Sequence, residues 1–319
     1  MNRSEHITVC ACTYKRSELL TRMLNALIVQ ETDDHFTYSI VIVDNDPTSS
    51  AKSIVEQFRS VAPVVIEYVN EPTVGLSHAR NKALDHTRGQ YIAILDDDEA
   101  PVTDWLLNLY TSLHRFHGDA VFGSVLPIFE NEPPEWITKR KVFYWRDEKN
   151  LSGAVLEKGA TNNVLLKKEY VDRFNLRFDP IFAMSGGCDE DFFRTFKNAV
   201  HKNLGRDGLF IASAEAVVHE FIPDDRCSID YIKKRHLLEG KALITILRKE
   251  NNYPILAKRF IQSVCSLPIY GLIILLLSAA DKGLRATMLF KWYFHLGILL
   301  EIFYFSPYKD RQSIGLQGK

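Results

Sequence analysis

The chain has 319 residues, of which 46% are hydrophobic and 25% are charged. This composition excludes collagen-like, low-complexity and disordered chains, and the length suits one large domain or two smaller ones. The net charge of −1 is unevenly divided, because residues 231–319 hold 14 Lys and Arg against 5 Asp and Glu (+9), which leaves −10 for residues 1–230. A basic tail on an acidic body argues against a nucleic-acid-binding protein. It suits a metal-binding body with a tail that meets an anionic membrane, although solvated surface charge gives the same count.

Cysteine usage and the N-terminus indicate the compartment. The five cysteines are scattered and include no CxxC motif. An odd number without that spacing favours a reducing compartment and argues against a zinc site. Residues 1–10 contain no long apolar stretch, so we expect no secretory signal. The cysteines are Cys10, Cys12, Cys188, Cys227 and Cys265.

The first 130 residues alternate between strand-like and helix-like segments. The helical periodicity occupies the connections between short, apolar, β-branched runs. This alternation predicts an α/β fold with a mostly parallel sheet and helices on both faces, in which ligands bind beyond the carboxyl ends of the strands. The predicted strands are 7–12, 38–43, 64–69, 91–95 and 120–126, and the predicted helices are 17–30, 51–60, 76–87 and 104–116.

The pattern changes after residue 126. Residues 127–145 are rich in proline, charge and aromatic rings, which predicts a long functional loop or lid. Further on, we expect a short strand at 163–166, a helix opening near Cys188, a strand ending near His219 and an amphipathic helix at 228–248.

Two apolar segments close the chain. Residues 260–280 are uncharged and nearly long enough to span a bilayer core. Residues 286–305 are apolar too, but contain Lys291, His295 and Glu301. Three arrangements stay open for this region: a transmembrane hairpin, helices lying in the membrane interface, and a surface packed against a partner.

Polar residues follow the predicted strands at the edge where ligands bind. Because the carboxyl ends of parallel strands meet at one edge of a sheet, these segments predict a single site. They are Thr13-Tyr14-Lys15-Arg16, Asp44-Asn45-Asp46, Gly75-Leu76-Ser77-His78-Ala79-Arg80-Asn81 and Asp96-Asp97-Asp98-Glu99.

The acidic run after the fourth strand is the most specific of these motifs. Three consecutive carboxylates repel one another, and a divalent cation such as Mg²⁺ or Mn²⁺ relieves that repulsion. Alternate residues of an extended segment face the same side, so Asp96 and Asp98 are predicted to point into one site. The alternative is a turn that caps the following helix. Arg80 could supply a cation for a bound pyrophosphate, or be a surface arginine of a helix. His219 could be a further metal ligand, although an ordinary core or surface histidine is the commoner case.

The segment Gly186-Gly187-Cys188-Asp189-Glu190-Asp191-Phe192-Phe193 is a second acidic motif. Two glycines permit close approach by a ligand, and a carboxylate held there could act as a general base. The helix dipole alone explains Asp189 well, but explains Asp191 less easily, since the two phenylalanines draw that turn towards the core. The chain lacks GxxxxGK[ST] and has no GxGxxG after the first strand, which argues against a P-loop ATPase and a dinucleotide-dependent dehydrogenase.

Together these motifs resemble the family 2 glycosyltransferases, which have the GT-A fold, over residues 6–245. The segment 219–226, with Arg235 and Gly240 downstream, resembles bacterial exopolysaccharide glycosyltransferases, including succinoglycan-type glucosyltransferases. The resemblance implies a GT-A catalytic domain at 1–230, with a nucleotide-sugar-binding half (1–126) and an acceptor-binding half (127–230). A basic, apolar, membrane-associating helical region would follow at 231–319.

The resemblance also implies a reaction. The chain would be a metal-dependent, inverting enzyme that transfers a sugar from a UDP-sugar to a lipid-linked saccharide in surface or exopolysaccharide biosynthesis. It would work at the cytoplasmic face of the inner membrane, without nucleic acid as a partner. Asp191 would be the catalytic base, and its removal should lower turnover by roughly 10²–10⁴-fold.

The remaining roles fall into three groups. The nucleotide-binding residues would be Thr13, Tyr14, Arg16, Asp44, Asn45, Arg80, Asp96 and Asp97. The ligands of Mn²⁺ or Mg²⁺ would be Asp96, Asp98 and His219. Candidate acceptor-binding residues, chosen for flat rings and hydrogen-bonding groups, are Trp136, Trp145, Asn162, Asn163, Gly187 and Glu190.

Two alternatives remain at this point. A nucleotidyltransferase would release pyrophosphate, and would carry a glycine-rich basic loop that residues 13–16 lack. A sugar-nucleotide-binding protein without catalysis is the other, against which the presence of Asp96, Asp98 and Asp191 argues.

Overall fold

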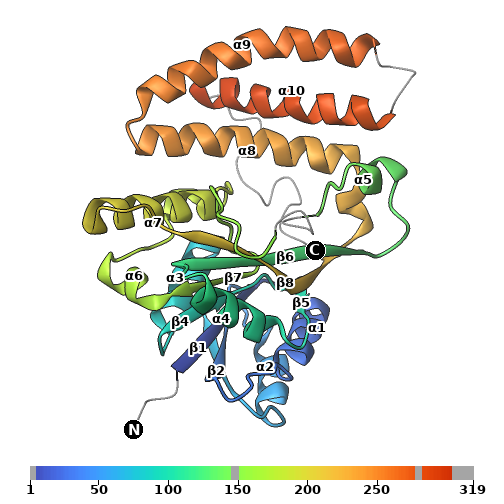
Figure 1. Ribbon diagram of the computed structural model, residues 1–319. Helices are drawn as coiled ribbons and strands as arrows, with labels where there is room; N and C mark the ends of the chain where they lie inside the picture. The colour runs from blue at the N-terminus through green and yellow to red at the C-terminus, as the bar shows by residue number, and fades with distance from the viewer. Residues whose placement is uncertain (1–4, 145–150, 277–281, 304–319) are drawn as a thin grey trace.

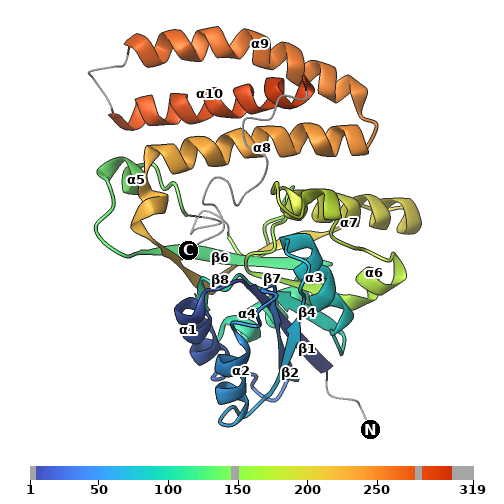
Figure 2. The same ribbon diagram turned by 180° about the vertical axis from the view of Figure 1, so that it is seen from behind.

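The computed structural model describes residues 5–144, 151–276 and 282–303. A mixed eight-stranded sheet lies at its centre, and the three helices α8, α9 and α10 are stacked beyond the sheet (Figures 1 and 2). The strand order is β3-β2-β1-β4-β7-β6-β8-β5. The strands are β1 (Glu5–Thr13), β2 (Phe36–Asp44), β3 (Val65–Asn70), β4 (Tyr91–Ile94), β5 (Glu99–Pro101), β6 (Ala120–Phe129), β7 (Val164–Lys167) and β8 (Phe210–Ile222).

The helices alternate with the strands through the first half of the chain, as predicted. The long helices of the second half are α7 and the three of the stacked layer. In order they are α1 (Ser17–Leu27), α2 (Lys52–Arg59), α3 (Leu76–Asp85), α4 (Trp105–Arg115), α5 (Glu135–Lys139), α6 (Lys168–Arg173), the 3₁₀ helix η1 (Pro180–Phe182), α7 (Cys188–Leu204), the 3₁₀ helix η2 (Asp224–Cys227), α8 (Ile229–Lys249), α9 (Tyr253–Leu276) and α10 (Lys282–Ile302).

The sheet is less parallel than the alternation predicts. β1 pairs in parallel with β2 and β4, and β2 with β3. β7, however, is antiparallel to both β4 and β6, and the short β5 is antiparallel to β8. The reversed β7 joins the two parallel groups, β3-β2-β1-β4 and β6-β8, into one sheet.

The predicted loop at 127–145 is partly regular structure. β6 continues to Phe129, which pairs with Ile222 of β8, and α5 follows at Glu135–Lys139. The long β6–β8 ladder gives the backbone of this segment hydrogen-bond partners, which an open lid would lack. Residues 145–150 lie outside the described residues.

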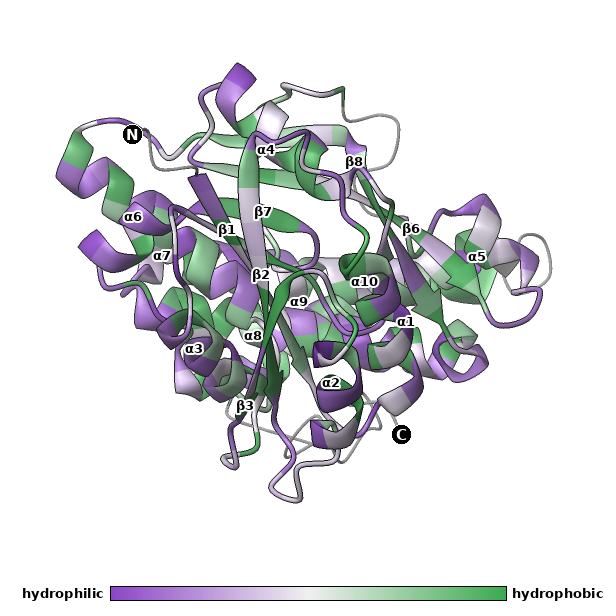
Figure 3. Cartoon of the chain, turned by 90° about the horizontal axis from the view of Figure 1, so that it is seen from below, coloured by the Kyte–Doolittle hydropathy of each residue, from purple (hydrophilic) through white to green (hydrophobic). Residues whose placement is uncertain are grey.

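Two apolar clusters cover the two faces of the sheet. Ile7, Val9 and Ala11 of β1 pack with α1, α2 and α4, whereas Cys10 lies in the cluster with α3 and α7. This alternation follows from the two-residue repeat of a strand. Figure 3 accordingly shows hydrophobic stretches along the strands and mixed colours on the surrounding helices. The core therefore fixes the strand ends, where the polar motifs lie.

The stacked layer is held together by a close crossing of α8 and α10. A Cβ atom added at Gly240 would lie 2.1 Å from the carbonyl oxygen of Phe294, and one at Gly297 equally close to that of Leu237. Glu301 of α10 pairs with Lys241 (3.4 Å) and Arg248 of α8. In both views α9 lies farthest from the sheet (Figures 1 and 2).

Helix α9 is long and apolar enough to cross a membrane. It spans Tyr253–Leu276, and only 6% of its most apolar 18-residue window is buried in the protein. Its exposed side chains include Ile261, Ile269, Leu272 and Leu275. Residues 260–276 of the apolar segment that the sequence places at 260–280 therefore lie on the outer side of the layer, and residues 277–280 lie outside the described residues.

Candidate active site

The acidic run lies at the carboxyl ends of β1 and β4, as predicted. The Thr13 hydroxyl donates a hydrogen bond to Asp97 Oδ2 at 2.7 Å. Arg16 Nη1 donates to Asp97 Oδ1 at 2.8 Å and lies 3.3 Å from Asp98 Oδ2. Asp97 and Asp98 are both buried. Thr13 and Arg16 therefore hold the acidic run in place from the neighbouring strand end.

Five carboxylates crowd this edge, those of Asp96, Asp97, Asp98, Glu99 and Glu220, and burial together with mutual repulsion raises the pKa values of Asp96, Asp97, Glu99 and Glu220. Desolvation, followed by repulsion from Asp98 and Asp189, raises the pKa of Asp96 to about 6 against the attraction of Arg80. Burial and the charge of Asp98 raise the pKa of Glu220 to about 7. Burial also raises the pKa of Glu99, whose Oε2 accepts the Asp96 backbone N–H at 2.8 Å. Excess negative charge is thus concentrated here.

Arg226 is a site residue to which sequence analysis assigned no role. It lies in η2 and donates to Asp98 Oδ2 at 3.0 Å and to Glu220 Oε1 at 3.2 Å. The resemblance of segment 219–226 to exopolysaccharide enzymes drew attention to this region. It did not single out Arg226, because a short 3₁₀ turn has no periodicity that reveals the direction of its side chains.

Arg80 joins the second acidic motif to the first. Its buried guanidinium donates to Asp96 Oδ1 at 3.2 Å through Nη2, and through Nη1 to Asp189 Oδ1 and to the Cys188 sulfur at 3.0 Å. The guanidinium also lies over the ring of Phe178. Asp189 of α7 and Asp96 of the acidic run are therefore held on two nitrogens of one side chain.

Asp191 lies on a different side of α7. It is 3% exposed, and Lys249 of α8 donates to its two carboxylate oxygens at 2.9 and 2.8 Å. The same ammonium is 2.8 Å from Asp179 Oδ2. In the described residues Asp189, and not the predicted base Asp191, is thus the acid of α7 that approaches Asp96. Sequence analysis missed Lys249, because no motif surrounds it.

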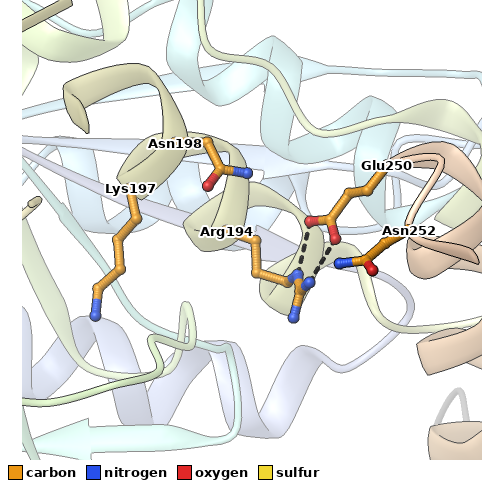
Figure 4. A pocket seen from close by; sticks show the side chains of 5 residues that line it. All are labelled: Arg194, Lys197, Asn198, Glu250 and Asn252. Carbon is orange, nitrogen blue, oxygen red and sulfur yellow. Dashed lines mark hydrogen bonds and ion pairs between the residues drawn. The ribbon is translucent and has the colours of Figure 1, made fainter. Parts of the chain in front are cut away.

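A cavity of about 420 Å³ lies on the same side of α7 as Lys249. It is lined by Arg194, Lys197, Asn198, Glu250 and Asn252 (Figure 4). Arg194 and Glu250 form a two-bond ion pair across it, with Nε 2.8 Å from Oε1. The pair fastens the end of α8 to α7, so the cavity belongs to the junction of these helices.

Two predicted nucleoside-binding residues shape the surrounding loops. The carboxylate of the fully buried Asp44 accepts the backbone N–H groups of Asp46 and Ala51 and the hydroxyl of Tyr68. Asn45 holds the loop that leads to α3, donating to two of its carbonyls and accepting the N–H of Gly75 at 2.7 Å. Nucleoside contact by these residues, and by the half-buried Tyr14, stays a prediction.

The predicted metal set of Asp96, Asp98 and His219 is not assembled. Across residues 5–144, 151–276 and 282–303, no three His, Cys, Asp or Glu side chains are grouped to hold a metal ion. Glu220 and His219 are successive residues of β8, so they point to opposite faces of the sheet. It is Glu220 that lies beside Asp98, since Arg226 bonds both acids.

The predicted acceptor residues have diverse environments. The buried side-chain amide of Asn163 bonds to Trp105, Ser124 and Ala216, and its contact with an acceptor stays a prediction. Trp136 packs on Phe290 of α10, with ring centroids 5.6 Å apart.

The other four acceptor candidates are Glu190, Gly187, Asn162 and Trp145. Glu190 accepts from Lys158 at 3.1 Å. Gly187 permits the approach of α8, since an added Cβ would lie 2.6 Å from Ala242 Cβ. Asn162 is half-buried, and Trp145 lies outside the described residues. All six acceptor assignments stay predictions.

Comparison with known proteins decides the family. Residues 8–175 match the model of the family described as "Glycosyl transferase family 2". The chain belongs to this family. It is therefore a glycosyltransferase, and the resemblance to exopolysaccharide enzymes is confirmed by a curated relative. This relative is the succinoglycan biosynthesis protein ExoM of Rhizobium meliloti, 32% identical over 75% of this chain and 74% of its own. The chondroitin synthase of Escherichia coli is 24% identical over 88% of this chain and 45% of its own.

Solved structures confirm the GT-A fold. The mannosyltransferase PcManGT of Pyrobaculum calidifontis, solved with GDP-Man and Mn²⁺, has a TM-score of 0.62 at 18% identity and covers 95% of this chain and 88% of its own. TarS 1–349 of S. aureus, solved with UDP-GlcNAc, has a TM-score of 0.51 at 14% identity, over 76% of this chain and 71% of its own.

Proposed function

We propose that this family 2 glycosyltransferase transfers a sugar from a UDP-sugar to a saccharide acceptor with inversion, in surface polysaccharide biosynthesis. The proposal rests on the two hydrogen bonds of the Arg80 guanidinium, one to Asp96, which follows β4, and one to Asp189 of α7. An acceptor hydroxyl near Asp189 would face a donor bound at Asp96. UDP is the proposed nucleotide because TarS, a relative in fold, was solved with UDP-GlcNAc.

The carboxylates at this edge have the chemistry of a divalent-cation site, but in the described residues Asp96, Asp98 and Glu220 are not grouped around one point, so they would have to move together to hold an ion. Asp96, Asp98 and Glu220 offer only oxygen donors, the chemistry that Mn²⁺ and Mg²⁺ prefer. Burial, with repulsion from Asp98, raises the pKa values of Asp96 and Glu220, and a cation at this edge would favour their ionised forms. A bound cation would stabilise the charge of the departing diphosphate.

Asp189 is the proposed catalytic base. In an inverting displacement the acceptor hydroxyl attacks the anomeric carbon opposite the leaving UDP, and one carboxylate takes the hydroxyl proton. A second protein carboxyl, as glycosidases use, is not required. Both acids are ion-paired, Asp189 with Arg80 and Asp191 with Lys249, but the side chain of Asp189 is about one-third exposed and that of Asp191 is buried, so Asp189 is the more accessible proton acceptor. We therefore propose Asp189 for this role, and the prediction of Asp191 as the base stays to be tested against it.

The acceptor is proposed to be carried on a lipid, and the enzyme to bind the cytoplasmic face of the inner membrane. The exposed apolar face of α9 and the excess of basic residues in 231–319 support a position in the interface. The ion pairs of Glu301 with Lys241 and Arg248 favour this arrangement over a spanning hairpin, because α10 would have to leave α8 to enter the bilayer.

The experiment uses the purified full chain, with Mn²⁺ and a panel of UDP- and GDP-sugars. We expect UDP to raise the melting temperature in the presence of Mn²⁺ and UDP-sugars to release UDP. Asp98→Ala should abolish the Mn²⁺-dependent part of UDP binding. Release of pyrophosphate would identify a nucleotidyltransferase, and UDP binding without release of UDP from any sugar donor would identify a binding protein.

A further inference from the structure

Arg226 bonds two different acids of the candidate site from a turn outside the strands. It comes from η2, the turn between β8 and α8, and its side chain is 15% exposed. Its two terminal nitrogens each bond a different acid, Asp98 at 3.0 Å and Glu220 at 3.2 Å. Neither contact uses the paired geometry in which one guanidinium grips one carboxylate.

The same oxygen of Asp98 already has a second guanidinium. Arg16 Nη1 lies 3.3 Å from Asp98 Oδ2, and Arg16 also bonds Asp97 at 2.8 Å. Asp98 would thus keep an ionic partner if Arg226 moved away. Arg16 is anchored through Asp97, so Arg226 is the guanidinium that can leave Asp98.

Donor binding would change the charges around Arg226 and favour its movement. A divalent cation on Asp98 would repel a guanidinium 3 Å away, because like charges at this separation interact strongly when they are partly buried. The diphosphate of the donor brings negative charge to the same place. Arginine binds phosphate oxygens through two parallel hydrogen bonds, a geometry that its present contacts do not provide.

We propose that Arg226 is a diphosphate-binding residue, held on Asp98 and Glu220 in the donor-free protein and transferred to the donor's diphosphate when it binds. The inference rests on the proposed function, since it places a nucleoside diphosphate at the Asp96–Asp98 edge. It assigns the turn before α8 to the donor site.

The test compares UDP with uridine as probes, in the presence of Mn²⁺, by calorimetric titration of the full chain. Arg226→Met should weaken UDP binding by about 10- to 100-fold, the effect expected for loss of a charged hydrogen bond. Uridine, which lacks the diphosphate, should bind both proteins equally. Arg226→Lys keeps the charge but not the paired geometry, and should give an intermediate loss for UDP alone.

Two controls separate this role from a structural one. Arg115→Met removes the same charge from the exposed end of α4 and should change neither affinity. Mn²⁺ titration without nucleotide should show no weakening in Arg226→Met, because Arg226 competes with the cation for Asp98. A weaker Mn²⁺ affinity would mean that Arg226 acts through Asp98, and would overturn the proposal.

The remaining outcomes are equally decisive. Equal losses for UDP and uridine, or no loss for UDP, would refute the role of Arg226. If Arg226→Met does not fold, the test is whether Arg226→Lys loses affinity for UDP and keeps its affinity for uridine. If the unmodified protein binds no UDP, the proposed function itself fails, and that result is distinct from a failure of Arg226.

Discussion

Asp189 and Asp191 are two positions apart on α7, and a helix turns by about 200° over that interval. They must therefore face different surroundings. Asp189 meets Arg80, the cation that also bonds Asp96, while Asp191 meets Lys249 and the end of α8. The same short motif thus supplies one carboxylate to the site and another to the packing of two helices.

A pair of isosteric substitutions separates these roles. Asp189→Asn should lower kcat by roughly 10²–10⁴-fold, because it removes the proton acceptor, and should also lower the free energy of unfolding, because it weakens the bond to the buried Arg80. Asp191→Asn should keep activity within about tenfold and lower the free energy of unfolding by about 1–3 kcal/mol, because it weakens the bond to Lys249. Steady-state transfer rates and urea unfolding measure both. The reverse pattern, with activity lost only in Asp191→Asn, would restore Asp191 as the base.

Lys249 gives the second prediction, on the pH dependence of stability. It is the ammonium shared by Asp191 and Asp179. Burial raises the pKa of Asp191 above its ordinary value of 3.8, against the effect of Lys249. At Asp179 burial acts in the same direction, but the hydrogen bonds from Lys249 and from the backbone of Ile181 hold its pKa below 3.8.

Lys249→Met should lower the free energy of unfolding by about 1–3 kcal/mol at pH 7, less than for a fully buried pair because the lysine is partly exposed. The loss should shrink as acid protonates Asp191, above pH 3.8, and then Asp179, below it, because only carboxylates attract the ammonium. Urea unfolding at pH 7 and in steps to pH 3 measures this. A loss independent of pH would mean that Lys249 stabilises by packing alone. Lys249→Arg, which keeps the charge, is the matched control.

At the scale of elements, sequence periodicity predicted the parallel strands and their helices, because apolar residues of β1 and β2 alternate between two packed faces. It did not predict that β7 is antiparallel, because the apolar pattern of a strand is the same in both directions. The direction of β7 is set by its pairing with β4 and β6. The Asp96–Asp98 run was predictable from its place after a buried strand. Arg226 and Lys249 were not, because their roles arise from contacts between segments more than 50 residues apart.

The crossing of α8 and α10 supplies a third prediction. Gly240→Ala should destabilise the protein by about 1–3 kcal/mol, since its methyl group would lie 2.1 Å from a backbone carbonyl of α10 and the helices would have to separate. Gly271→Ala in α9 is the matched control. There the nearest atom to the added Cβ is 3.7 Å away, so alanine should be neutral or up to about 1 kcal/mol stabilising. Similar stabilities for the two variants would show that the crossing tolerates a wider separation.

At the scale of the whole molecule, the stacked helices border the candidate site. Arg226, just before α8, contacts Asp98, and Lys249, at its end, contacts the helix that carries Asp189. Helix α9 lies on the far side of this layer from the sheet (Figures 1 and 2). A membrane on the exposed face of α9 would therefore adjoin the side of the protein where the strands end, where a lipid-linked acceptor could arrive.

Liposome flotation tests that arrangement with the full chain. The unmodified protein should float with vesicles containing anionic lipid, and less at high salt, because Lys258 and Arg259 of α9 add electrostatic attraction. The double variant Leu272→Glu and Leu275→Glu should leave the fold intact, because these side chains are 58% and 71% exposed. Its two added charges should reduce the partitioning of the protein into the vesicles at least about tenfold. Val61→Glu, at a position 72% exposed beyond α2, adds charge away from α9 and should float like the unmodified protein. Equal flotation of all three proteins would place the membrane contact elsewhere, and recovery of the unmodified protein in the soluble fraction would leave α9 as a surface for a protein partner.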